Sequence, residues 1–333
     1  MFTVERVVSN EGKGRVIQEV VELDVNTAAK ELDLTRYRTI RAWNFECFED
    51  LQKLTLRWNL FKRIENFECL TSLTYLTLYD NQIDKLENLE NLVNLTFLDV
   101  SFNRIPKIEG LENLKKLKEL YLVHNKIQII EGLENQTELE LIELGDNRIR
   151  FIKNLGHLKK LKKLFLGANQ IRKIEGLDEL TNLEDLSIPA NAITVIAGLD
   201  NLKKLKTLGL AQNGIRKMDG LGGLKSLVSL DLNDNLIERV ENVDQILGLR
   251  TLWLRNNKLS SWQELLALRD ITQLRMLMLE MNPVYSSDYT YRNRMREVLP
   301  QIKMLDGLPV GWIQGDPYQP LPKDFFENFK TIN

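Results

Sequence analysis

One column of positions carries aromatic and acidic side chains at the spacing of a regular repeat. Its members are 22 residues apart, with a final spacing of 25: Thr55, Thr77, Asp99, Tyr121, Glu143, Phe165, Ser187, Gly209, Asp231, Trp253 and Met278. Large aromatics beside carboxylates have the composition of protein-binding hot spots, and the carboxylates could pair with lysine or arginine on a partner. The column therefore indicates recognition of a folded protein with a basic, partly apolar surface.

Two plainer interpretations of these side chains stay open. Exposed aromatics can pack flat against neighbours on adjacent strands and support a sheet, and exposed acids can simply be solvated. Phe102, which lies beside a repeated asparagine, could lean into a turn. The column as a whole still favours an interaction site, because a patch of this size on a monomer usually marks one.

The elements that must position the column follow from the repeat itself. The string Leu-x-x-Leu-x-Leu-x-x-Asn, with occasional Ile or Val, places asparagine at 59, 81, 103, 125, 147, 169, 191, 213, 235 and 257, and again at 282. This pattern is typical of a leucine-rich repeat solenoid. We therefore predict an α/β solenoid with a curved parallel β-sheet on its concave face and short 3-10 or irregular turns on its convex face.

A single copy of the repeat explains this prediction. Inward Leu120 and Leu122 alternate with outward Glu119 and Tyr121, which is the period of a strand, and apolar residues then follow at three-residue spacing from Ile127. One repeat cannot bury its apolar side alone, so stacked neighbours must share a core. The asparagine amide should satisfy backbone groups of the turn that would otherwise be buried unpaired.

One core position departs from the pattern. Gln136 stands where neighbouring copies have leucine. A buried polar group costs stability unless it is paired. The sequence therefore predicts either a locally opened turn or a water-filled niche at this point.

One exposed position of the repeat alternates in charge. Its occupants are Lys118, Glu140, Lys162, Glu184 and Lys206. Equivalent positions on neighbouring rungs should lie about 5 Å apart, so these side chains predict a ladder of exposed ion pairs. Such pairs contribute about 0.2–1 kcal/mol each, so the ladder should fix register more than it supplies stability.

The repeats run unbroken over residues 32–282, about twelve copies, which predicts one elongated solenoid. Residues 1–31 are predicted to form an N-terminal cap over a degenerate first repeat at Leu32-Asp-Leu34. The residues expected to cover that core are Val20, Val21, Leu23, Ala28 and Ala29.

Residues 283–307 are predicted to form a C-terminal cap, with helical character from Tyr289 to Leu299. Tyr291-Arg292, Leu299-Pro300 and Leu305-Asp306 resemble the cap of intracellular leucine-rich repeats. Residues 308–333 contain four prolines and are predicted to lack regular structure. Within this tail, Phe325, Phe326 and Phe329 either pack against the cap or stay loose.

Charge and cysteine usage exclude several classes of partner and compartment. The net charge of −2 implies no bulk attraction to nucleic acid or to an anionic membrane, and the lysine runs do not make the one-signed stripe that nucleic acid requires. No stretch is apolar enough for a signal core or a membrane span. Cys47 and Cys69 are the only cysteines, and a disulfide between them is not expected. Nucleus and cytoplasm are the expected compartments.

No arrangement of residues suited to catalysis is evident in the sequence. There is no phosphate-binding glycine loop, no clustered metal ligands and no nucleophile elbow. The only histidines, His124 and His157, are predicted to lie on the surface without a cysteine or serine partner. We therefore expect no enzymatic activity, no metal and no cofactor, and a monomer when the chain is free.

Several phrases of the sequence resemble the regulatory subunit 7 family of protein phosphatase 1, whose members are leucine-rich repeat proteins. The phrases are Leu78-Tyr-Asp-Asn-Gln-Ile83, Leu98-Asp-Val-Ser-Phe-Asn103, Ile142-Glu-Leu-Gly-Asp-Asn-Arg-Ile149, Leu164-Phe-Leu-Gly167 and Asn257-Lys-Leu-Ser-Ser-Trp262. The resemblance covers roughly residues 50–307 and includes the expansion before Leu274. The ordered set of column residues makes it more specific than the repeat alone.

The resemblance implies a non-catalytic subunit that binds the catalytic subunit of protein phosphatase 1 through its concave face, often together with inhibitor 3. Family members hold the phosphatase in an inactive, incompletely metallated state, and they lack the Arg/Lys-Val-x-Phe docking peptide, which this sequence lacks too. Three positions depart from the family, with Tyr121 for Phe, Thr251 for Glu and Met278 for Tyr. The implied partner-binding residues are Asp99, Tyr121, Glu143, Phe165, Asp231, Thr251, Trp253 and Met278.

Two other interpretations follow from the class of repeat alone. Similar repeats occur in cytoskeletal and centrosomal adaptors, including dynein light chains, and in scaffolds of RNA particles that bind a protein domain of the RNA-recognition type. The acidic column disfavours direct contact with nucleic acid in either case. Binding to the phosphatase, or to tubulin-associated partners instead, would distinguish the regulatory subunit from the adaptor.

Overall fold

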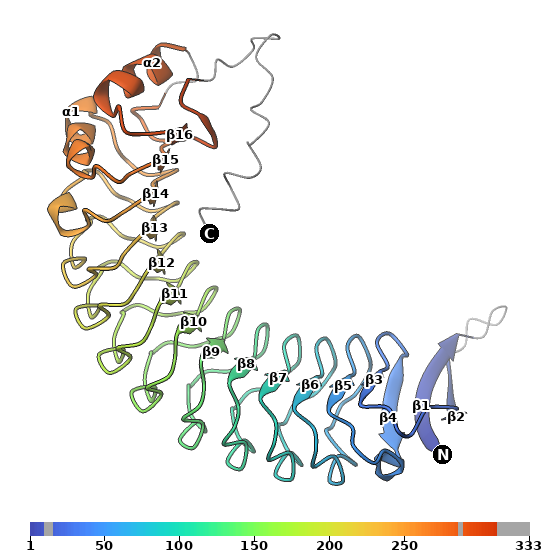
Figure 1. Cartoon of the computed structure of the whole chain (residues 1–333). Coiled ribbons are helices and arrows are strands. Elements are labelled where there is room, and N and C mark those ends of the chain that lie inside the picture. The colour runs from blue at the N-terminus through green and yellow to red at the C-terminus, as the bar shows by residue number, and fades with distance from the viewer. Residues whose placement is uncertain (10–15, 286–288, 312–333) are drawn as a thin grey trace. The chain divides into compact units, whose positions relative to one another are not determined.

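The structure is a computed structural model that describes residues 1–9, 16–285 and 289–311. It divides into two compact units, Met1–Leu183 and Glu184–Asn333, and each is described by itself. In each unit the strands follow one side of the coil and the turns follow the other (Figure 1). The predicted leucine-rich repeat solenoid is confirmed, with a parallel sheet and few helices.

Short parallel strands at the repeat spacing form the sheet. In the first unit they are β3 (Glu31–Asp33), β5 (Lys53–Thr55), β6 (Tyr75–Thr77), β7 (Phe97–Asp99), β8 (Glu119–Tyr121), β9 (Leu141–Glu143) and β10 (Lys163–Phe165). In the second unit they are β11 (Asp185–Ser187), β12 (Thr207–Gly209), β13 (Ser229–Asp231), β14 (Thr251–Trp253) and β15 (Met276–Met278). Equivalent repeat positions lie side by side, as Leu98 does beside Leu120.

The inward side chains form the core of each unit. Leu98, Leu120 and Ile142 are completely buried, and so are Ile127 and Ile130 from the turns. Burying one such side chain contributes about 1.5–3 kcal/mol, but only where the adjacent rung covers it. Each rung therefore depends on its neighbours for stability.

The turns keep a three-residue period without forming continuous helices. The Leu114 N–H donates to the Leu111 carbonyl at 2.9 Å, and the Leu117 N–H donates to the Leu114 carbonyl at 3.2 Å. In the described residues, helical turns occur only as η1 (Phe45–Cys47), η2 (Val243–Gln245), α1 (Trp262–Leu265), η3 (Leu266–Asp270) and α2 (Tyr289–Val298). α1 and η3 lie within the segment that makes the last repeat longer than the others.

The repeated asparagines bond to the backbone as predicted. Asn125 is buried, and its Oδ1 accepts a hydrogen bond from the Ile105 N–H at 3.0 Å. Its Nδ2 donates to the Val100 carbonyl at 3.1 Å and to the Leu122 carbonyl at 3.2 Å. The same pattern recurs at other asparagines, so each amide joins its own rung to the rung before it.

Asn125→Ala is expected to lower the free energy of unfolding by about 1–3 kcal/mol, because the buried Ile105 N–H would lose its partner and the Val100 carbonyl would keep only its bond from Asn103 Nδ2. Urea denaturation measures this loss. Asn135→Ala is the matched control, since the exposed Asn135 amide donates only to the Glu112 carbonyl at 3.2 Å. Equal losses in the two variants would contradict the role assigned to Asn125.

The N-terminal cap is a three-stranded antiparallel sheet in the order β2 (Val16–Leu23), β1 (Phe2–Ser9), β4 (Thr39–Trp43). β3 pairs in parallel with β5, so the degenerate first repeat forms where it was predicted. The cap sheet therefore includes a strand from beyond residue 31, after the first rung.

The residues that cover the N-terminal core are not those predicted. Phe2 and Val4 of β1 are completely buried, and the Phe2 ring lies 4.9 Å from that of Phe45. Val20 is instead 65% exposed and Ala28 is exposed, so their prediction was wrong. Val21, Leu23 and Ala29 are half-buried. The reason is that β1, not β2, is the central strand of the cap sheet.

A buried polar cluster holds the C-terminal cap. The Tyr291 hydroxyl donates to Asp306 Oδ2 at 3.0 Å, and Asp306 Oδ1 accepts from the Leu279 N–H at 2.6 Å. Burial raises the pKa of Tyr291, so its hydroxyl remains a donor. The Arg292 guanidinium donates to the carbonyls of Leu305 and Pro309. These bonds tie α2 to the last rung.

The chain beyond the cap helix adds two short strands. β16 (Met304–Leu305) pairs in parallel with β15, and β17 (Leu308–Pro309) pairs antiparallel with β16. The start of the segment predicted to lack regular structure is therefore a strand. The prediction for Phe325, Phe326 and Phe329 lies outside the described residues.

Gln136 is accommodated inside a closed turn. Its side chain is completely buried, Nε2 donates to the Leu111 carbonyl at 2.6 Å, and Oε1 has no protein partner. The turn bonds from the Gln136 N–H to the Leu133 carbonyl and from the Leu139 N–H to the Gln136 carbonyl are both present. The prediction of an opened turn was wrong. The Gln136 Nε2 group is satisfied by its bond to the Leu111 carbonyl of the preceding rung, so the turn stays closed.

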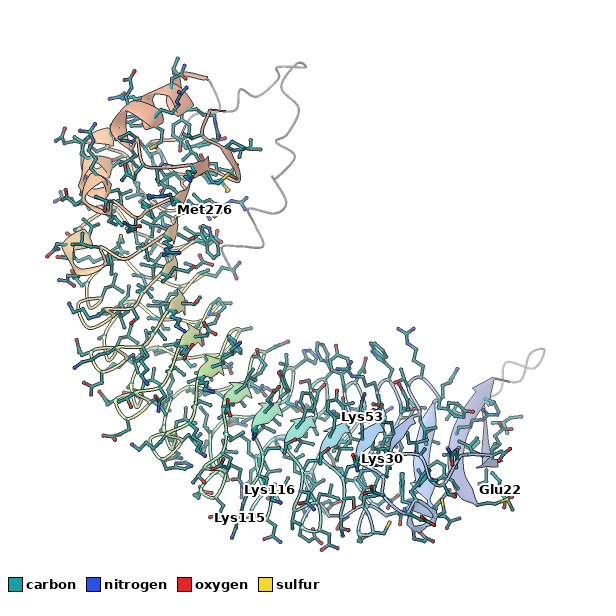
Figure 2. The ribbon with its side chains drawn as sticks, in the orientation of Figure 1. Glu22, Lys30, Lys53, Lys115, Lys116 and Met276 are labelled. Carbon is teal, nitrogen blue, oxygen red and sulfur yellow. The ribbon has the colours of Figure 1, made fainter. Side chains whose placement is uncertain are left out.

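Inter-rung ion pairs of the predicted kind form in each unit. Lys162 Nζ lies 2.6 Å from Glu140 in the first unit, and Lys206 Nζ lies 2.6 Å from Glu184 in the second. Lys115 and Lys116 extend from the turn side of the coil (Figure 2). Cys47 and Cys69 are free thiols, in line with the expectation of no disulfide.

Candidate protein-binding surface

The predicted column lies at the third residue of each strand, on the outer surface of the sheet. In the first unit, register places Tyr121 between Asp99 and Glu143, and Glu143 beside Phe165. We call Asp99, Tyr121, Glu143 and Phe165 the first-unit column. Within this unit the structure brings together all four residues that the sequence singled out.

The second unit contains a shorter column of the same kind. Register places Trp253 between Asp231 and Met278, and all three side chains are half-buried. We call these three residues the second-unit column. Thr251 does not belong to it, because its side chain is only 1% exposed. A partner could not touch Thr251 without displacing its neighbours.

Asp99 is covered by neighbouring side chains and is engaged within the chain. It is only 5% exposed, and its Oδ2 lies 3.1 Å from Arg57 Nη2 and 3.2 Å from the Thr77 hydroxyl. Its Oδ1 accepts a hydrogen bond from the Ser101 N–H at 3.1 Å. Asp99 is therefore already paired within the chain and is not a free acid for a partner.

Tyr121 extends a stack of aromatic rings that the sequence reasoning missed. The rings of Tyr75 and Phe97 are stacked with their centroids 4.2 Å apart, and Phe97 lies 5.2 Å from Tyr121. The Tyr121 hydroxyl donates to Glu119 Oε2 at 2.9 Å, and burial together with this bond raises the pKa of Tyr121. The signal was available, because Tyr75 and Phe97 occupy the same repeat position in consecutive copies. The sheet-supporting interpretation thus applies to Tyr121.

Glu143 is a half-buried carboxylate between two aromatic neighbours. Its Oε1 accepts a hydrogen bond from the Gly145 N–H at 2.8 Å, and no lysine or arginine of the described residues pairs with it. Burial raises the pKa of Glu143 despite that bond. A Cβ at Gly145 would lie 2.8 Å from Oε1, so glycine is what lets the carboxylate sit here. Such a desolvated, unpaired acid is suited to receive a cation.

Phe165 and Trp253 are the aromatics most available to a partner. Both are half-buried, and neither ring contacts another aromatic ring in the part of the chain that the structure describes. At these two positions, therefore, no contact with another aromatic ring supports the interpretation that the aromatics stabilise the sheet. Small residues lie on the rungs at Phe165, namely Gly145 and Gly167, whereas the register neighbours of Trp253 are Asp231 and Met278.

Asp231 resembles Glu143 in its surroundings. Its Oδ1 accepts a hydrogen bond from the Asn233 N–H at 2.9 Å, and register places it beside Trp253. Burial, and to a lesser degree repulsion from Asp234, raise the pKa of Asp231. Each unit therefore holds one acid–aromatic couple, Glu143 with Phe165 and Asp231 with Trp253.

The histidines have structural surroundings. His124 Nδ1 lies 2.5 Å from Asp146 Oδ2, and the His124 ring stacks on Phe102. His157 Nε2 lies 2.7 Å from the Leu133 carbonyl. Among the described residues no group of three histidine, cysteine, aspartate or glutamate side chains is placed to hold a metal ion. None of the described helices has the length and apolar character needed to cross a membrane.

Comparisons with known proteins identify the class. A family model described as leucine-rich repeat matches residues 113–213 and 202–311. An internalin from Listeria monocytogenes is 23% identical over 83% of this chain and 86% of its own, with a TM-score of 0.69. A leucine-rich repeat protein from Leptospira interrogans is 26% identical over 78% of this chain and 73% of its own, with a TM-score of 0.63. The comparison with curated proteins gives no match.

The chain belongs to the leucine-rich repeat family. Solenoids of this class are typically non-catalytic scaffolds for interactions between proteins, and they use the extended sheet surface for binding. The two acid–aromatic couples lie on that surface, so the fold and the candidate site agree on protein recognition.

Proposed function

We propose that the chain is a non-catalytic regulatory subunit that binds the catalytic subunit of protein phosphatase 1 and controls its activity or maturation. The observation that carries the proposal is the pair of acid–aromatic couples on the sheet surface. Their residues, Glu143 with Phe165 and Asp231 with Trp253, match in type and order those that the resemblance to regulatory subunit 7 implies. The proposed compartments are the nucleus and the cytoplasm.

Each couple is suited to a basic side chain of the partner. The carboxylate would pair with the ammonium or guanidinium group, and the aromatic ring would cover the apolar stem of the same lysine or arginine. Desolvation of Glu143 and Asp231 favours this use, because a buried carboxylate gains more from a cation than an exposed one does.

The departures from the family pattern fall outside the couples. Thr251 is buried, so contact with the partner in the second unit would depend on Asp231 and Trp253. Met278 is half-buried beside Trp253 and would add apolar surface without the hydroxyl of a tyrosine. Inhibitor 3 is the proposed third component of the complex, and it would bind together with the phosphatase.

The test is calorimetric titration of the full chain with purified phosphatase catalytic subunit, both metal-loaded and metal-depleted. Phe165→Ala is expected to weaken binding about tenfold or more, because an anchoring ring would be lost. Phe151→Ala is the matched control, since Phe151 is 59% exposed in a turn and should not affect binding.

Absence of binding to either form of the phosphatase would contradict the proposal. Recovery of tubulin-associated proteins by the same chain from cells would then favour the cytoskeletal adaptor. Phosphatase activity measured across the titration would show whether binding inhibits the enzyme.

A further inference from the structure

Bulky aromatics occupy a backbone position in the first unit that does not suit them. The residue just before each repeated asparagine has a left-handed φ, which is 53° at Trp58 and 56° at Phe102. Glycine tolerates this conformation, asparagine, aspartate and histidine are enriched in it, and Asp80, His124 and Asp146 occupy it in other copies. A bulky residue there is costly, and such costs concentrate at functional sites.

Trp58 and Phe102 form a continuous row with Tyr79 and His124, and the row faces solvent. Ring centroids are 5.8 Å apart for Trp58 and Tyr79, 4.9 Å for Tyr79 and Phe102, and 4.7 Å for Phe102 and His124. Trp58 is 40% exposed and Phe102 is 37% exposed. We call these four residues the aromatic row. It crosses neighbouring strands about 4.8 Å apart, so it is long enough for roughly four to five residues of an extended peptide.

Three cations lie close to the aromatic row along the chain. Arg104, Lys126 and Arg148 each directly follow a buried asparagine and come two residues after Phe102, His124 and Asp146. We call these three residues the basic row. All three are exposed, and in the described part of the chain their side chains make no ion pair or hydrogen bond.

The local charge is opposite in sign to that of the whole chain. The basic row is joined by Arg36, whose guanidinium lies 4.4 Å from the centre of the Trp58 ring. Asp80 and Asp146 lie along the aromatic row, and Asp146 is already engaged by His124. Asp99 is paired with Arg57, whose guanidinium lies 5.0 Å from the centre of the Tyr79 ring. Cations therefore exceed carboxylates here, although the net charge of the chain is −2.

We propose that the aromatic row and the basic row together bind an extended, acidic segment of a partner protein that also carries apolar or aromatic side chains. The rings would cover the apolar side chains, and the cations would pair with the carboxylates. Tryptophan, tyrosine and arginine are the residues most enriched in protein-binding hot spots. The proposal goes beyond phosphatase binding and uses none of the residues of the acid–aromatic couples, which fit a basic partner.

The test is selection of phage-displayed random twelve-residue peptides on the full chain, followed by affinity measurement of the enriched peptides. Peptides rich in glutamate or aspartate with interspersed apolar residues are expected. The Trp58→Asn/Phe102→Asn variant should bind them at least about tenfold more weakly. It should keep or raise its unfolding midpoint, because asparagine accepts the left-handed backbone.

Charge reversal provides a second arm with a matched control. Arg104→Glu/Lys126→Glu/Arg148→Glu should abolish binding of the selected peptides. Lys115→Glu/Lys116→Glu/Lys118→Glu changes the net charge equally on exposed side chains outside both rows and should bind as the parent does.

Three outcomes would overturn the proposal. The first is enrichment of only basic or uncharged peptides, and the second is no enrichment of peptides whose binding depends on the two rows. The third is binding of single-stranded polyuridylate that is lost in the same variants, which would assign the rows to RNA instead.

Discussion

Glu143→Gln is expected to weaken binding to the phosphatase catalytic subunit by about 2–5 kcal/mol, which corresponds to thirtyfold or more. The reason is that a partner cation seated against the half-buried carboxylate would be left desolvated without an opposite charge. Glutamine keeps an oxygen that can accept the hydrogen bond from the Gly145 N–H, so only the charge changes. Calorimetric titration of parent and variant measures the loss.

The same substitution is expected to stabilise the free chain at neutral pH. Burial raises the pKa of Glu143 in the folded state. A carboxyl with a raised folded-state pKa contributes stability that is fully present below its unfolded-state pKa and is lost as pH rises through the folded-state value. The unfolding midpoint of the variant should therefore exceed that of the parent at pH 7, and the difference should close as the pH falls to about 4.

Glu140→Gln is the matched control for both measurements. Glu140 directly precedes β9, the strand that ends in Glu143. It pairs with Lys162, and that hydrogen bond lowers the pKa of Glu140. Its contribution to stability is therefore present above the usual glutamate pKa and is lost as pH falls, which is the opposite sign. Phosphatase binding by Glu140→Gln should be unchanged. Parent-like affinity in Glu143→Gln would remove Glu143 from the proposed contact.

Trp253→Ala is expected to reduce affinity for the phosphatase by about 2–4 kcal/mol, because a large anchor and its contact area would be lost together. The indole has no aromatic partner among the described residues and lies between Asp231 and Met278. Its removal should also lessen the effect of Asp231, since the two would hold one basic side chain. A double-mutant cycle with Asp231→Asn measures this coupling.

Trp58→Asn is the control for the tryptophan experiment. Trp58 is also a half-exposed tryptophan on the solenoid surface, but it belongs to the aromatic row. If the two surfaces are separate, Trp58→Asn should leave phosphatase affinity unchanged while Trp253→Ala lowers it. Affinity of Trp253→Ala within twofold of the parent, with the fold intact by circular dichroism, would exclude Trp253 as an anchor.

The repeat period by itself determined much of this protein. A spacing of 22 residues with asparagine at one position identifies the solenoid, and it predicts which side chains of neighbouring rungs lie side by side. The bonds of Asn125 and the adjacency of Glu143 and Phe165 follow directly from that register. These features could be predicted because they depend only on the length of the rung and on the alternation of a strand.

The depth of each outward side chain was decided by the tertiary structure. Asp99 and Thr251 were predicted as contacts, but Asp99 is 5% exposed and paired with Arg57, and Thr251 is 1% exposed, whereas Glu143 is half-buried beside Gly145. Exposure at one position depends on the sizes and charges of residues on adjacent rungs, which no single repeat contains. The strand order of the N-terminal cap was likewise not encoded in the repeat, because the cap lies outside it. The period therefore specifies neighbours, and packing between rungs specifies which of those neighbours a partner can reach.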